Sequence, residues 1–146
     1  MLEECGYINY ILSDKTGTLT QNDLEFRSLA IGHSEYKTDI ANMLKQTHFD
    51  IANQEVLNLF RCICLCHDVF IYEVNGKEEL SGMSQDEIKL IQMCMDSKVI
   101  RIKEKTNETI ILEVYSKKEG KYLDEVYKIL KTFEFSSERR QMSILV

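Results

Sequence analysis

The 146-residue sequence contains no proline, and its basic residues are scattered. Without proline, turns and helix ends must be inferred from glycine, asparagine and hydrophobic spacing. The formal net charge of -6, with Lys117-Lys118 and Arg139-Arg140 as the only adjacent basic pairs, argues against a nucleic-acid partner. No apolar run approaches the roughly 18 to 20 residues of a membrane helix. We therefore expect the chain to be soluble by itself.

Hydrophobic residues make up 44% of the sequence and charged residues 29%, which is typical of a globular chain. The length suits one domain, or one domain with a piece of a second. The cysteine count of five is odd, and Cys62, Cys64 and Cys66 lie in an apolar run. This pattern favours reduced thiols in a cytosolic protein. With His67 these cysteines could be read as metal ligands, but their two-residue spacing does not match the usual zinc spacings.

The first third of the sequence predicts strands and a short helix. Tyr7 to Ser13 is an apolar, β-branched and aromatic run followed by Asp-Lys-Thr-Gly, so we expect a buried strand that ends in a loop. Glu25 to Ile31 has a period near two before Gly32, which predicts a strand or a hairpin. Asp39 to Gln46 is expected to form a short helix.

The rest of the sequence predicts two helices and then strands. Gln54 to about Cys66 has apolar residues at helical spacing. Ser84 opens a second helix, with Glu87 three residues later as a capping-box partner. The strands expected after Ser97 are Val99 to Lys103, Thr109 to Tyr115, about Val126 to Phe135, and Gln141 to Val146, with Thr106 to Glu108 as a hairpin tip. The expected fold class is α+β, an antiparallel sheet flanked by helices.

The most specific motif is Asp14-Lys15-Thr16-Gly17-Thr18-Leu19-Thr20. A carboxylate at the end of a buried strand can act as a nucleophile on a phosphoryl group. Gly17 allows the backbone to approach a phosphate, and threonine hydroxyls and amides supply donors for its oxygens. Mg²⁺ is expected as well, because carboxylate and phosphate repel each other. The residue types alone would suit an ordinary polar turn, whereas the complete heptapeptide favours phosphoryl chemistry.

This heptapeptide resembles the signature of the P-type ATPases, membrane pumps of the haloacid-dehalogenase superfamily. The resemblance implies that Asp14 is phosphorylated, that Asp14 and the Thr16 backbone help to hold Mg²⁺, and that Lys15 and Thr18 face the phosphate. Phosphatases of the superfamily carry a second Asp as general acid and base where this sequence has Thr16. Without that group an acyl phosphate should persist longer, which favours a pump.

Other segments resemble the phospholipid-translocating class, the flippases. They are Tyr10 to Ser13, Gln21-Asn22, Cys66 to Val69, and Ser84 to Glu87. Two positions depart from the class pattern: Asp68 stands where Thr is frequent, and Gln85 replaces proline.

The segment Phe133 to Ser143 resembles the nucleotide-binding segment of the same family, in which an aromatic ring stacks on adenine. The resemblance makes Phe135 that ring and places Arg139 and Arg140 near the phosphates. Glu87 is then the carboxylate that faces the adenine amino group. An aromatic face with cations and a carboxylate acceptor is chemically suited to a purine that carries polyphosphate.

The resemblance therefore predicts an excised part of a larger enzyme. Residues 1–22 would be the first strand and signature loop of a haloacid-dehalogenase-like α/β phosphorylation domain, and residues 23–146 an incomplete nucleotide-binding domain. The expected ligands are ATP and Mg²⁺, and the parent is expected to be a multi-pass membrane protein that moves a phospholipid, with a possible accessory subunit. This part of it would lie on the cytoplasmic side and be inactive alone. The alternatives are a cation-transporting P-type ATPase and a nucleotide-binding module without catalysis.

Overall fold

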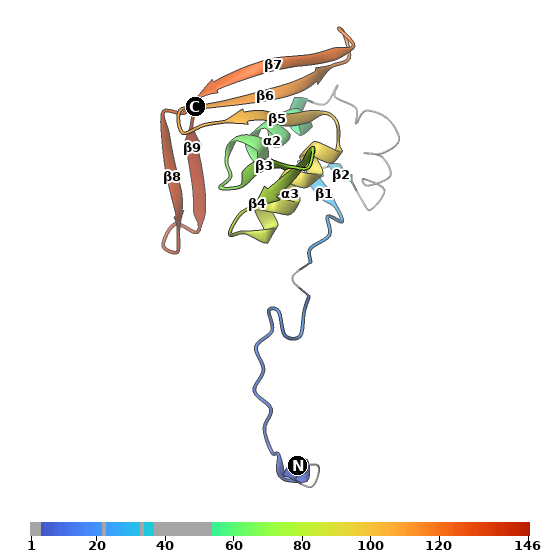
Figure 1. The fold of residues 1–146 in the computed structure, drawn as a ribbon, viewed down its shortest axis with the longest axis vertical. Coiled ribbons are helices and arrows are strands. Elements are labelled where there is room, and N and C mark those ends of the chain that lie inside the picture. The colour runs from blue at the N-terminus through green and yellow to red at the C-terminus, as the bar shows by residue number, and fades with distance from the viewer. Residues whose placement is uncertain (1–3, 22, 33, 37–53) are drawn as a thin grey trace.

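The computed structural model describes residues 4–21, 23–32, 34–36 and 54–146. The helix expected at Asp39 to Gln46 lies outside the described residues, as does Asn22. An extended amino-terminal arm leads into a body that holds the two α-helices and the strands (Figure 1). No helix of the described part is long and apolar enough to cross a membrane.

In the described part of the arm, the 3-10 helix η1 (Glu4–Tyr7) comes first, and no other named helix or strand lies among the described residues before β1 (Leu29–Ile31). The buried strand predicted at Tyr7 to Ser13 does not form, and Tyr10 and Leu12 are 87% and 97% exposed. The backbone N–H and C=O groups of a strand are satisfied by a neighbouring strand, and its apolar side chains need a packed layer to cover them. No named strand in the described part of the chain pairs with this segment.

Both predicted helices of the body are confirmed. Helix α2 (Gln54–Leu65) buries a face that includes Val56, Phe60 and Cys64. Helix α3 (Gln85–Asp96) begins at the N-cap Ser84, whose side chain accepts a hydrogen bond from the backbone N–H of Glu87. Apolar spacing and a cap residue were therefore sufficient to predict these elements.

A three-stranded antiparallel sheet packs against the helices. Its order is β5 (Ile100–Lys105), β6 (Thr109–Ser116) and β7 (Lys121–Lys128). The predicted tip between β5 and β6 is confirmed, because the hydroxyl of Thr106 accepts from the backbone N–H groups of Glu108 and Thr109. Along β6 the side chains alternate, and its inward residues are buried against the helices.

The remaining strands form two-stranded hairpins. They are β1 (Leu29–Ile31) with β2 (Ser34–Tyr36), β3 (Phe70–Val74) with β4 (Lys77–Ser81), and β8 (Lys131–Ser136) with β9 (Gln141–Leu145).

The structure corrects two of the predictions for these strands. The sequence prediction missed the β3–β4 hairpin, although its turn is Asn75-Gly76, both at positive φ, a frequent hairpin signal. The single strand predicted over Val126 to Phe135 is divided, because β7 ends at Lys128 and β8 begins at Lys131. The backbone of Ile129 and Leu130 instead bonds to Glu108 and Leu145.

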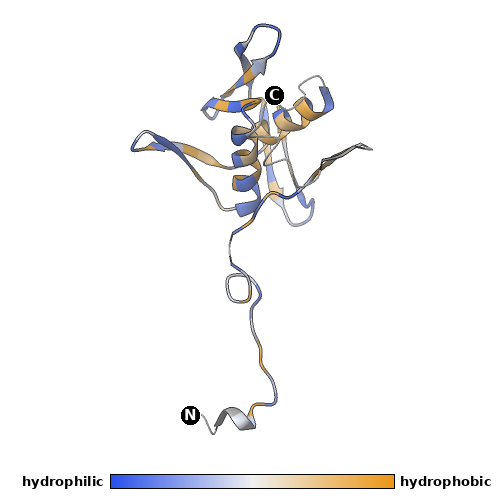
Figure 2. Ribbon diagram, turned by 90° about the vertical axis from the view of Figure 1, so that its right-hand side faces the viewer, coloured by the Kyte–Doolittle hydropathy of each residue, from blue (hydrophilic) through white to orange (hydrophobic). Residues whose placement is uncertain are grey.

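The hydrophobic core lies between α2, α3 and the inner face of β5 and β6. Hydrophobic and hydrophilic residues are interleaved along the helices in Figure 2, as expected for elements with one buried face. The largest fully buried side chains include Phe60, Ile91, Ile100, Ile110 and Leu112. Each such side chain stabilises the fold by roughly 1.5 to 3 kcal/mol relative to leaving it in water. The core fixes the end of α2 and the start of α3 next to each other.

Candidate functional site

The signature loop in the arm folds into a compact turn. The carbonyl of Lys15 accepts hydrogen bonds from the backbone N–H groups of Leu19 and Thr20, at 3.0 and 3.1 Å, and from the Thr20 hydroxyl at 3.2 Å. Gly17 has a φ of 77°, a conformation that glycine adopts without strain. The loop therefore closes on itself through its own backbone.

The Asp14 carboxylate lies at the edge of this turn and is exposed. Its Oδ1 accepts from the backbone N–H of Lys15 at 2.7 Å. Thr16 and Thr18 in the same turn are also exposed. Among the described residues there is no group of three or more His, Cys, Asp or Glu that could hold a metal. Mg²⁺ is often held by one or two carboxylates together with phosphate oxygens and water. A single exposed carboxylate fits a magnesium ion whose other ligands are phosphate oxygens and water.

The Glu87 carboxylate lies at the start of α3 and faces the end of α2. The backbone N–H of Glu87 donates to the Ser84 hydroxyl at 3.3 Å, so this half of the predicted capping box is confirmed. The carboxylate itself bonds to another element: its Oε2 accepts from the backbone N–H of Asp68 at 2.9 Å. Glu87 thus ties α3 to the turn that follows α2.

A cavity of about 200 Å³ lies beside this carboxylate. It is formed by α2, α3, the turn after α2, and β9, and its lining residues are Cys62, Ile63, Cys66, His67, Glu87, Leu90, Ile91 and Met142. Pockets that enclose a drug-sized ligand measure roughly 300 to 1,000 Å³. This cavity is therefore large enough for part of a nucleotide only.

His67 is the buried polar side chain of the cavity wall, with 3% of its surface exposed. Its Nδ1 accepts from the backbone N–H of Val69 at 3.0 Å, and Nε2 has no hydrogen-bond partner among the residues that the structure describes. Burial and the nearby Lys105 ammonium lower the pKa of His67 to about 4, against a smaller opposing effect of the Cys64 backbone. The imidazole is therefore neutral at physiological pH. Burial raises the pKa of the Cys66 thiol, and the nearby Cys62 and Glu87 raise this pKa to a smaller extent.

The β8–β9 hairpin carries the other predicted nucleotide residues. The Phe135 ring is 65% exposed on β8, next to the irregular register between Phe133 and Ser136. Arg139 does not lie over this ring. Its guanidinium carbon is 5.6 Å from the centroid of Phe133, and its Nη2 donates to the Ser143 hydroxyl at 3.1 Å. Sequence reasoning missed Phe133 as the aromatic partner of Arg139.

Arg140 shapes the turn of the same hairpin. It has a φ of 51°, and its backbone N–H donates to the carbonyl of Ser136 at 2.7 Å. A non-glycine residue in the left-handed region is uncommon. The tight turn therefore fixes the backbone of Arg140, independently of what its side chain binds.

The structure brings together only some of the predicted site residues. Glu87 shares the cavity with Met142 from the Phe133 to Ser143 segment, whereas Phe135, Arg139 and Arg140 do not line it. The signature loop lies on the arm, away from the body in Figure 1. Predicted phosphate chemistry and predicted base recognition therefore occupy different parts of the chain.

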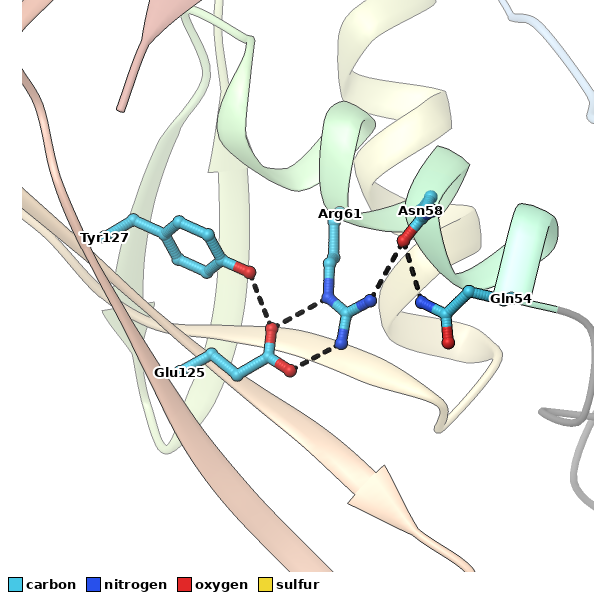
Figure 3. A network of polar contacts seen from close by, with 5 residues as sticks. All are labelled: Gln54, Asn58, Arg61, Glu125 and Tyr127. Atoms are coloured by element: carbon cyan, nitrogen blue, oxygen red, sulfur yellow. Dashed lines mark hydrogen bonds and ion pairs between the residues drawn. The ribbon is translucent and has the colours of Figure 1, made fainter.

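A second polar cluster, without a sequence prediction, joins α2 to β7 (Figure 3). Arg61 donates from Nε and Nη2 to the two carboxylate oxygens of Glu125, at 2.8 and 2.6 Å, and the Tyr127 hydroxyl donates to the same carboxylate at 2.7 Å. The Arg61 hydrogen bond lowers the pKa of Glu125, and the same bond raises the pKa of Arg61. A cavity of about 450 Å³ lies beside this pair. No sequence signal links residues 64 positions apart.

Comparison with known proteins identifies relatives along nearly the whole chain. No family model matches the sequence. Phospholipid-transporting ATPase 11C of Mus musculus is 36% identical over 161 residues, which cover 99% of this chain and 14% of the mouse protein. Phospholipid-transporting ATPase IG of Homo sapiens is 34% identical, and phospholipid-transporting ATPase tat-1 of Caenorhabditis elegans is 28% identical, each over 99% of this chain.

The chain spans about 14% of the length of these relatives, so it corresponds to one segment of them. Their similarity extends over both the arm and the body, because it covers 99% of the chain. By sequence, the chain is similar over 99% of its length to phospholipid-transporting ATPases, at 28 to 36% identity in these three relatives.

Proposed function

We propose that the chain is the segment of an ATP-driven phospholipid transporter that binds ATP and carries the phosphorylated aspartate. The observation that carries this proposal is similarity to phospholipid-transporting ATPases over 99% of the chain, which includes the complete motif Asp14 to Thr20. The same similarity favours a phospholipid over a cation as the cargo. The parent would be a membrane protein with this segment on its cytoplasmic side.

Base recognition is assigned to the body. The exposed Phe135 ring offers a face on which adenine can stack, and the cavity next to Glu87 offers a carboxylate acceptor for the adenine amino group. Arg139 and Arg140 lie at the tip of the same hairpin as Phe135, where they can meet phosphate oxygens. Arg139 would then exchange its contact with Ser143 for a phosphate.

Phosphoryl transfer is assigned to the arm. In the complete pump an Asp14 oxygen attacks the γ-phosphorus of ATP, the bond from that phosphorus to the bridging oxygen breaks, and ADP leaves. Lys15 and the Thr18 hydroxyl would hold the γ-phosphate oxygens, and Asp14 with the Thr16 carbonyl would hold Mg²⁺. When bound, the ion neutralises charge that would otherwise repel the carboxylate from the phosphate.

An NMR titration of the chain with ATP tests the assignment of base recognition. Phe135→Ala should raise the Kd strongly, because a stacked base is worth on the order of 1 to 3 kcal/mol. Phe70→Ala is the matched control, since Phe70 is 69% exposed and Phe135 65%, but Phe70 lies on β3 outside the proposed site. Asp14→Asn should leave the Kd nearly unchanged. Equal effects of Phe135→Ala and Asp14→Asn would contradict the division between arm and body.

A further inference from the structure

The turn Cys66 to Val69, between α2 and β3, is fixed from both of its sides. Within the turn, the backbone N–H of Val69 donates to His67 Nδ1 at 3.0 Å. From β5, the Lys105 ammonium donates to the His67 carbonyl at 2.8 Å. On the opposite side, the N–H of Asp68 donates to Glu87 Oε2 at 2.9 Å. The position of the Asp68 N–H, and with it that of the Glu87 carboxylate, therefore depends on where Lys105 holds the turn.

We propose that Lys105 is a positioning residue for base recognition, which holds the Cys66 to Val69 turn so that the Glu87 carboxylate faces its cavity in the orientation that selects adenine. This inference rests on the proposed function. It adds a residue from β5, which does not line the cavity, to the residues that set nucleotide specificity.

The charges around Lys105 suit this role. The residue as a whole is exposed, but its ammonium end is partly buried against the turn. Burial lowers the pKa of Lys105, and the carboxylates of Asp68 and Glu87 together with Cys66 oppose this effect. The ammonium thus balances negative charge at the cavity edge. The hydrogen bond from the ammonium to the His67 carbonyl holds the Lys105 side chain in one position, whereas a surface lysine without such a bond would be mobile.

The orientation of Glu87 matters because the two purines present opposite groups at the same edge. Adenine has an amino donor where guanine has a carbonyl oxygen. A fixed carboxylate accepts from the amino group and repels the carbonyl oxygen, so it separates ATP from GTP. A carboxylate released from the Asp68 N–H can turn away and loses this preference. Stacking on Phe135 would remain, because a purine of either kind has a π-face.

The experiment compares the Kd of ATP and GTP for the wild-type chain, Lys105→Met, Lys105→Arg and Lys103→Met. Lys105→Met keeps the alkyl stem and removes the donor, so it should reduce the ATP over GTP preference about tenfold. Lys105→Arg should restore most of the preference, because arginine can also donate to the His67 carbonyl. Lys103→Met is the matched control: Lys103 lies on the same strand and instead bonds to Asp124 at 2.6 Å.

The amide resonance of Asp68 gives a second readout that needs no variant. In the wild type, ATP should shift this resonance and GTP should shift it far less, since only ATP contacts the carboxylate to which the amide donates. Unchanged preference in Lys105→Met, or equal Asp68 shifts with both nucleotides, would overturn the role of Lys105 while ATP binding stands. Absence of ATP binding to the wild type would overturn the proposed function as well.

Discussion

The buried, neutral His67 predicts a specific pH dependence of stability. Its pKa is lowered to about 4 in the folded chain by burial and by Lys105, against 6.5 in an exposed imidazole. Between these values the unfolded chain binds more protons than the folded chain, so unfolding is favoured as the pH falls. The stabilising contribution is therefore complete above pH 6.5, and it is lost as the pH falls through about 4.

The magnitude follows from the two pKa values. Over the whole window the loss is about 3 kcal/mol, and about 2 kcal/mol of it falls between pH 7 and pH 5. Protonation of Nδ1 would also remove the acceptor for the Val69 N–H, next to the Lys105 ammonium 3.4 Å away. Loss of stability should thus be accompanied by opening of the turn after α2.

The assay is urea unfolding followed by far-UV circular dichroism, because the chain contains no tryptophan. His67→Asn is the matched variant: its Oδ1 can accept from the Val69 N–H, but it does not titrate. The wild type should lose about 2 kcal/mol more than His67→Asn between pH 7 and pH 5. Equal losses in the two proteins would refute the assignment of a neutral, buried imidazole.

Further predictions concern the α2–β7 pair, the core and the nucleophile. Glu125→Gln should lower the free energy of unfolding by about 1 to 2 kcal/mol, because Arg61 keeps a partly buried charge with a weaker partner. The difference in stability between this variant and the wild type should vanish in acid, as the pH falls through the lowered pKa of Glu125. Phe60→Ala should cost about 3 to 5 kcal/mol in urea unfolding because its ring is fully buried, whereas exposed Phe70→Ala should change stability little. In the complete pump, Asp14→Asn should abolish an acid-stable phosphoenzyme, and a phosphoenzyme that persists would exclude Asp14 as the nucleophile.

The sequence predicted the elements whose signals are local. Helix α3 follows from Ser84 and the apolar residues after it, and the β5–β6 hairpin follows from alternation and the polar tip. The prediction of a strand at Tyr7 to Ser13 was wrong because an apolar pattern indicates only that the side chains of a segment can be buried. A strand also needs a neighbouring strand with which its backbone can pair. The β3–β4 hairpin shows the opposite error, because the sequence contains the Asn75-Gly76 turn signal but the prediction includes no hairpin there.

Side-chain partners were less predictable than elements. A capping-box pattern at Ser84 and Glu87 predicts that the carboxylate bonds within its own helix, but Glu87 bonds to Asp68. Nothing in the spacing of Arg61 and Glu125 indicates that they meet. Such contacts form only when the core packs α2 against α3 and the sheet. This packing depends on residues throughout the body and not on the spacing of the two partners in the sequence.

The placement of the candidate groups has a consequence for how binding and chemistry are coupled. Asp14 lies on an exposed arm, while Glu87 is fixed to the body through Asp68. Binding energy from the base alone cannot lower the barrier to phosphoryl transfer, because interactions equal in ground and transition states only increase affinity. Base recognition becomes catalytic only when it brings the γ-phosphate to Asp14 in a defined geometry. In the proposed pump, the orientation of the arm relative to the body would therefore control the rate. Phe135 would hold the base, and Glu87 would control which nucleotide is delivered.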